Sequence, residues 1–334
     1  MITDSLWLCF SKNSFFVSIY LKNCQRFLTL PTTMAKQTVT RFKTLPSLPV
    51  SLRRSQCVVY KKELLLCGSD PESECFSYNM IRKQYKSICS YTKMDVHCVT
   101  DVRCVVADVR NNNDKILNDI TLLSFGGRRS RNKNILRMYY KSVWDDDGNM
   151  NIITNKAFNK WEPLVDEHNN PIQMERGEDD YTGARSLIGG SNNHLLFITY
   201  PPKSIAVFNL NTFKYINRST FLVDDYIQYP CFISRRENRN QKKNEMLLFC
   251  KKTGLLIEYD EDRNTFQGHR LSVCDSIANL NDYAYVRVND NNVLFFGGMD
   301  FGKWGNKVHK YSIEEDKWTM FEHTLPIPLG SGTA

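Results

Sequence analysis

The feature that most constrains the fold of this 334-residue chain is a pattern that occurs five times in the same order. Each copy has a short apolar run followed by a strand-like segment with an aromatic residue. In four copies a second aromatic residue follows seven positions later. The first aromatic positions are Tyr78, Tyr139, Phe208, Tyr259 and Tyr311, which are 61, 69, 51 and 52 residues apart. Such a period is typical of architectures in which each repeat is one supersecondary unit.

The last copy shows the pattern most clearly. The apolar run at residues 293–296 ends at Gly297 and Gly298, and Tyr311 and Trp318 follow on two further strand-like segments. An apolar run bounded by glycine is typical of a buried strand. Glycine accepts positive φ and close backbone approach, so the pair predicts a sharp turn beside a neighbouring unit. The two aromatic residues are expected to pair across adjacent strands and fill the wedge between units.

Every copy also opens with its own first strand, so each unit predicts four strands. Residues 56–60 and 185–188 are two such segments, and short turns rich in Lys, Ser, Asn or Asp join them to the apolar runs. Asn and Asp suit hairpins because they tolerate left-handed conformations. No long helical period occurs, and the sequence therefore predicts an all-β fold.

On these residues the chain resembles the kelch-repeat family of β-propellers, in particular the kelch-motif families of unicellular eukaryotes. The resemblance covers about residues 42–329 and implies a ring of four-stranded blades. The motif positions that carry it are Gly126, Gly127 and Trp161 in the second unit, Gly297, Gly298, Tyr311 and Trp318 in the fifth, and Tyr78 and Tyr259 in the first and fourth. The third and fourth units lack the diglycine. The alternative is another all-β repeat fold with the same sheet chemistry, such as a different propeller class.

The ends of the repeat region predict the domain organisation. Residues 1–40 are interpreted as a non-propeller extension, 41–329 as the propeller and 330–334 as a short tail. Residues 45–49 and 325–329 resemble each other, so the second segment is expected to introduce an incomplete sixth unit. We interpret the chain as truncated there, with the N-terminal residues as the alternative cover for the gap. Met34 also resembles an ordinary protein start.

Charge and cysteine content restrict the compartment and the partners. The net charge is +8, from 44 Lys and Arg against 36 Asp and Glu, which indicates solubility rather than nucleic-acid binding. The eleven cysteines include no Cys-x-x-Cys pair, and most lie in apolar runs. We therefore expect buried free thiols in a reducing, cytoplasmic compartment. No apolar run is long enough to span a bilayer, so no membrane role is expected.

The sequence contains no recognisable catalytic constellation. The six histidines show no metal-ligand spacing, and no nucleophile elbow, phosphate loop or dinucleotide fingerprint occurs. The Tyr, Cys and His set of the copper radical oxidases with a galactose oxidase-like fold cannot be mapped onto the chain. We therefore expect no catalytic residues, no metal and no cofactor.

Two loop clusters are candidates for binding a protein partner, whose identity the sequence does not give. Arg128, Arg129 and Arg131 follow the diglycine of the second unit, and Phe301 and Trp304 follow that of the fifth unit. Propeller loops emerge together on the faces of the ring, which favours a non-enzymatic interaction scaffold. Ordinary solvated loops are the alternative reading of these clusters. The alternative functions are a degenerate enzyme with a central-channel site and weak anionic-surface or nucleic-acid binding through the Arg128 and Arg235 loops.

Overall fold

The computed structural model describes twelve segments of the chain. They are residues 5–8, 19–22, 42–44, 46–50, 55–68, 74–91, 104–108, 120–126, 134–145, 157–174, 179–235 and 242–329. In this part of the chain, no helix has the length and apolar character that crossing a membrane requires.

Five four-stranded antiparallel sheets make up most of the described chain, and in each the strands follow one another in chain order. The first is β4 (Gln56–Tyr60), β5 (Glu63–Cys67), β6 (Glu74–Asn79) and β7 (Gln84–Ser90). The second is β8 (Cys104–Asp108), β9 (Ile120–Phe125), β10 (Leu136–Tyr140) and β11 (Glu162–Pro163). The third is β12 (Arg185–Gly189), β13 (Leu195–Tyr200), β14 (Ser204–Asn209) and β15 (Lys214–Thr220). The fourth is β16 (Cys231–Ser234), β17 (Lys243–Cys250), β18 (Thr253–Asp260) and β19 (Thr265–Arg270). The fifth is β20 (Ala284–Arg287), β21 (Asn292–Phe296), β24 (Val308–Ser312) and β25 (Lys317–Met320).

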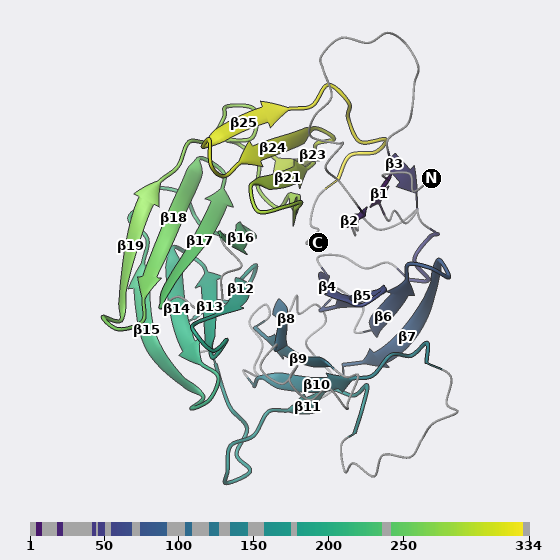
Figure 1. Cartoon of the computed structure of the whole chain (residues 1–334), viewed down its shortest axis with the longest axis vertical. Coiled ribbons are helices and arrows are strands. Elements are labelled where there is room, and N and C mark those ends of the chain that lie inside the picture. The colour runs from purple at the N-terminus through teal and green to yellow at the C-terminus, as the bar shows by residue number, and fades with distance from the viewer. Residues whose placement is uncertain are drawn as a thin grey trace.

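These sheets lie in a ring, with the first strand of each toward the centre and the last at the rim (Figure 1). The fold is therefore a five-bladed β-propeller, and the prediction of an all-β propeller is confirmed. A hairpin of β22 (Met299–Asp300) and β23 (Lys303–Trp304) is inserted in the fifth blade. A three-stranded sheet of β1 (Ser5–Leu8), β2 (Ile19–Lys22) and β3 (Phe42–Thr44) lies between the fifth and first blades in Figure 1.

The seven-residue spacing of aromatic residues comes from the turn between the third and fourth strands of a blade. The paired positions are Tyr78 with Tyr85, Phe208 with Tyr215, Tyr259 with Phe266, and Tyr311 with Trp318. Five residues after the first aromatic residue, each turn has a residue with positive φ, namely Lys83, Phe213, Asn264 or Asp316. A fixed turn fixes the register, so the two rings face each other across the strands at centroid distances between 4.7 and 5.1 Å.

The second blade departs from this arrangement. Trp161 does not pair with Tyr139, which lies opposite Thr121. The ring of Trp161 instead stacks on Tyr91 of the preceding blade, with centroids 5.0 Å apart. Its Nε1 also donates to the Cys75 Sγ at 3.3 Å. Trp161 thus fills the wedge between the first two blades, as Trp318 does between the fourth and fifth.

The two ends of the repeat region are covered by their own linkers. Leu48 packs on the face of the first blade that is turned away from the second blade. Leu325 and Leu329 pack on the face of the fifth blade that is turned away from the fourth. Residues 325–329, which were expected to introduce a sixth unit, bond to the fifth blade instead. The Leu329 amide donates to the Gly305 carbonyl at 2.7 Å, and its carbonyl accepts from the Gly298 amide at 2.7 Å.

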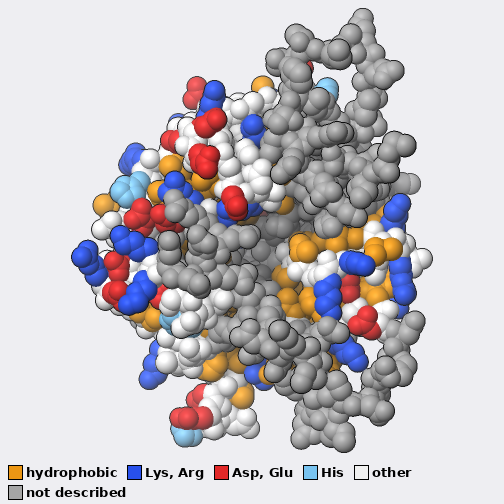
Figure 2. Space-filling view, in the orientation of Figure 1, with side chains coloured by type: hydrophobic (Ala, Val, Ile, Leu, Met, Phe, Trp, Pro, Cys, Tyr) orange, Lys and Arg blue, Asp and Glu red, His pale blue; other side chains and the backbone are white. Residues whose placement is uncertain are grey.

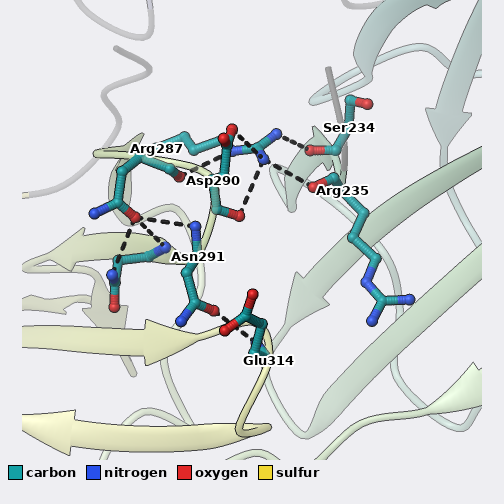
Figure 3. A network of polar contacts seen from close by, with 8 residues as sticks. Ser234, Arg235, Arg287, Asp290, Asn291 and Glu314 are labelled. Carbon is teal, nitrogen blue, oxygen red and sulfur yellow. Dashed lines mark hydrogen bonds and ion pairs between the residues drawn. The ribbon is translucent and has the colours of Figure 1, made fainter. Parts of the chain in front are cut away.

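Arg287 joins the fourth and fifth blades (Figure 3). Its Nη1 and Nη2 donate to the Ser234 and Arg235 carbonyls of the fourth blade, each at 2.8 Å. Its Nε donates to the Asn289 carbonyl at 3.1 Å, which fixes the turn of its own blade. The guanidinium group therefore satisfies main-chain acceptors of two neighbouring blades at once.

Replacing Arg287 with methionine is expected to lower the free energy of unfolding by about 2 kcal/mol, because several charge-assisted hydrogen bonds are lost. Urea denaturation followed by tryptophan fluorescence measures the effect. Arg263→Met, at an exposed turn residue, is the matched control and should change stability by less than about 0.5 kcal/mol. Equal effects of the two substitutions would contradict the assigned role.

Candidate interaction face

Two kinds of connection leave the propeller at the same end. Because each blade is an antiparallel meander, the turn between its second and third strands lies at the end where the chain passes to the next blade. We call this end the crossover face. It includes residues 221–230, which join the third blade to the fourth, the Lys251 and Lys252 turn, and the β22–β23 hairpin.

Large apolar side chains are exposed on these segments. Leu222 is 92% exposed, Tyr226 48% and Phe301 98%. Phe301 occupies the tip of the hairpin with a φ of 44°, a conformation that non-glycine residues seldom adopt. All three lie on the crossover face, so a partner that covers this face would remove their apolar surface from water, which favours binding.

The predicted binding residues are only partly brought together. Phe301 and Trp304 lie on the same hairpin, but Trp304 is half-buried and is paired with Met299 across the two strands. Arg128, Arg129 and Arg131 lie outside the described residues, as does Gly127. Gly126, the last described residue of that segment, has a φ of +76°, which glycine adopts readily.

Gly126 and Arg235, the last described residues before the two basic loops, lie at opposite ends of the propeller. The loop after Gly126 joins the second and third strands of its blade, whereas the loop after Arg235 joins the first and second of its own. Arg235 is also engaged, because its Nη1 lies 3.4 Å from the Glu245 Oε2 and its carbonyl accepts from Arg287. This arrangement gives no support to a shared basic surface built from both loops.

A groove lies between the outer strands of the third and fourth blades, where they meet the crossover face. It consists of two adjoining cavities of about 450 and 200 Å³ that share Val223, Leu255 and Arg270. The larger one is lined by apolar side chains of both blades, namely Ile205, Phe221, Leu255, Ile257 and Phe266. The groove thus has an apolar floor and an open rim.

Polar contacts beside the groove join the fourth blade to the third blade and to the link between them. Toward the opposite face, the Asn217 Nδ2 donates to the Asn264 carbonyl and Oδ1 at 2.6 and 2.9 Å. At the crossover face, the Thr253 hydroxyl donates to the Asp225 Oδ2 at 2.7 Å. These bonds hold the blades at fixed positions, so the space between them is part of the fold.

The charges around the groove include two free cations. Lys252 and Arg270 are exposed and form no ion pair with any residue that the structure describes. Asp224 is exposed, and Asp225 is half-buried beside Thr253. Figure 2 shows charges of both signs over the rim of the third to fifth blades and apolar side chains gathered over the first.

Burial shifts the pKa of one histidine and several cysteines of the described blades. His309 is buried, and its Nε2 lies 3.0 Å from the Ser276 hydroxyl. Burial, with the nearby Lys307 charge, lowers the pKa of His309 to about 4, so its ring is neutral at physiological pH. The seven cysteines whose side chains the structure describes are free thiols, and burial raises the pKa of Cys75, Cys231 and Cys250. Within the described ranges, no three His, Cys, Asp or Glu side chains form a potential metal site.

Sequence reasoning missed the groove and its most exposed neighbour, Leu222. Residues 221–223 follow strand β15 as a short apolar run, which has the same pattern as the end of a buried strand. The unusual feature was that this run follows a half-polar strand and precedes two aspartates. No family model matches the chain, and no curated protein matches it at a significant level.

Proposed function

We propose that the chain is a non-enzymatic interaction scaffold that binds a protein partner through the crossover face. The observation that carries this proposal is the exposure of Leu222, Tyr226 and Phe301 on that one face. Aromatic side chains such as those of Tyr226 and Phe301 are enriched in protein interfaces, and tyrosine is among the residues that contribute most of the binding energy. A rigid ring that presents them on short, hydrogen-bonded segments loses little conformational entropy on binding.

We further propose that the propeller is of the kelch type. Its support is the paired aromatic residues on the third and fourth strands together with glycines at the end of the second strand. Gly126 approaches the linker that follows its blade, since an added Cβ would lie 3.0 Å from the Cβ of Tyr181. Gly297 occupies the same position relative to Leu329 in the fifth blade. In both blades glycine admits the following linker against the end of the second strand.

The proposal predicts that a photo-reactive amino acid at position 222 cross-links to one specific partner in extracts of the source cells. The same amino acid at position 81 is the matched control, because Ile81 is also exposed, at 64%, but lies on a turn of the opposite face. Leu222→Asp should abolish capture by a cross-linker at position 301, whereas Ile81→Asp should not. Neither substitution should change stability by more than about 0.5 kcal/mol.

Equal capture from positions 222 and 81 would contradict the proposed face. So would capture that persists in the Leu222→Asp variant.

A further inference from the structure

No feature of the described structure around position 268 requires a glycine there. Gly268 lies in the middle of β19 and is exposed. Its backbone is not left-handed, and an added Cβ would meet nothing within 4 Å. The pairing of β18 with β19 runs through it without a shift, with Ile257 opposite Gly268. A turn, a bulge and internal crowding are therefore all excluded as reasons for glycine.

A glycine inside a strand weakens it, because it has no side chain to pack and loses the most backbone entropy on folding. The remaining recognised reason for such a glycine is close approach by a ligand or another backbone. Gly268 lines the 450 Å³ cavity. The position without a side chain is therefore on the wall of the groove.

The strand directs alternate residues to this groove. Phe266, Gly268 and Arg270 lie on one side of β19, opposite Tyr259, Ile257 and Leu255 of β18. Along β19 the surface of the groove is therefore aromatic at Phe266, main chain at Gly268 and cationic at Arg270. Lys252 adds a second cation to the smaller cavity, which Arg270, Asp224 and Asp225 also line, and the Asp225 carboxylate accepts from the Thr253 hydroxyl.

The groove is bordered by two sheet edges. β15 is the last strand of the third blade and β19 the last strand of the fourth, and neither pairs with another strand on its outer side within the described residues. Edge strands offer free main-chain donors and acceptors to an extended chain, while alternate side chains provide specificity. A polypeptide is the ligand that matches both the edges and the bare glycine.

We propose that an extended segment of the protein partner binds in this groove, with its backbone against Gly268. One apolar side chain of the segment occupies the larger cavity, and an acidic side chain pairs with Arg270 and Lys252. This inference rests on the proposed function, because it names the kind of segment that the partner presents at the rim of the crossover face.

The test uses the full chain and a phage-displayed library of random peptides about ten residues long, enough to extend past β19. Peptides selected on the unmodified chain are labelled with fluorescein, and their affinity is measured by anisotropy. Gly268→Phe places a large side chain on the wall of the groove, at a position where the added Cβ meets nothing within 4 Å. His269→Phe is the matched control, because it puts the same side chain one residue along, on the other side of the strand.

We expect selected peptides that carry an acidic residue near an apolar one. Gly268→Phe should weaken their binding more than about tenfold, and Arg270→Glu should weaken it by about tenfold through charge reversal. His269→Phe should leave the affinity unchanged. Thermal unfolding of the variants confirms that the fold is retained.

Failure to select peptides, or selected peptides that bind Gly268→Phe normally, would overturn the inference. Binding of a single-stranded oligothymidylate that Gly268→Phe abolishes would overturn it in favour of a nucleic-acid groove. Specific capture at position 222 alongside normal binding by Gly268→Phe would leave the proposed function standing while the groove proposal fails.

Discussion

Replacing Glu63 with alanine is expected to lower the free energy of unfolding by about 4 kcal/mol, since it leaves several buried hydroxyls without their acceptor. Glu63 is only 5% exposed at the start of β5. Its Oε2 accepts from the Ser77 hydroxyl at 2.6 Å and from the Tyr140 hydroxyl at 2.5 Å. Its Oε1 accepts from the Ser142 hydroxyl at 2.5 Å.

These bonds join two blades through one carboxylate. Ser77 belongs to the first blade, whereas Tyr140 and Ser142 belong to the second blade and the turn that follows its third strand. Ser77 also accepts from the Trp144 Nε1 at 2.8 Å, so the network continues into that turn. A shorter side chain at position 63 would leave a void as well as unpaired hydroxyls, and both effects destabilise the fold.

The measurement is urea denaturation of the Glu63→Ala and Glu63→Gln variants. Glutamine keeps one acceptor oxygen and should lose less stability than alanine. Glu322→Ala, at an exposed carboxylate, is the control and should stay within about 0.5 kcal/mol of the unmodified chain. A loss below about 1 kcal/mol for Glu63→Ala would contradict the stabilising role of the hydrogen bonds to the Glu63 carboxylate.

The same network predicts a dependence on alkaline pH. Burial, together with the hydrogen bond to Glu63, raises the pKa of Tyr140 above its ordinary value of 10.0. A raised folded-state pKa means that the Tyr140 contribution is complete below pH 10 and is lost as the pH rises toward the folded value. Tyr140→Phe should therefore reduce the slope of stability against pH above pH 10, as measured by urea denaturation.

The repeat could be predicted because its signals are local. A turn with one positive-φ residue fixes the seven-residue spacing between Tyr259 and Phe266, and the spacing is visible along the chain. The diglycine at Gly297 and Gly298 is likewise a local signal of a sharp turn. Recognising several such units in order was sufficient for the all-β propeller.

The polar joints between blades could not be predicted, because their partners are distant in sequence. Glu63 is 77 residues from Tyr140 and 79 from Ser142. In the sequence it follows two lysines and precedes an apolar run, so it resembles part of an exposed turn. Arg287 bonds to carbonyls, which have no sequence signature at all.

The groove was missed for a related reason. Its walls come from two blades, and its most informative residue, Gly268, is informative only once the space around it is known. The predicted surface residues were identified by residue type, which does not give their exposure. Phe301 is almost fully exposed, while Trp304 on the same hairpin is half-buried.

Replacing Gly297 with alanine is expected to lower the free energy of unfolding by about 3 kcal/mol or more, because the linker that covers the fifth blade can no longer dock. An added Cβ would lie 2.1 Å from the Leu329 carbonyl oxygen and 2.8 Å from its carbon. Both atoms belong to main chain, so the clash cannot be relieved by a rotamer change. Undocking exposes Leu325 and Leu329, which are 2% and 0% exposed on the fifth blade.

Gly302 provides the control that separates the clash from backbone strain. Both glycines have positive φ, +63° at Gly297 and +79° at Gly302, but an added Cβ at Gly302 meets nothing within 4 Å. Gly302→Ala should therefore cost only the left-handed strain of about 1 kcal/mol. Urea denaturation gives the stabilities, and amide hydrogen exchange at Gly298 reports whether its bond to the Leu329 carbonyl is lost. Equal losses for the two variants would show that strain alone, and not close approach of the linker, requires glycine at position 297.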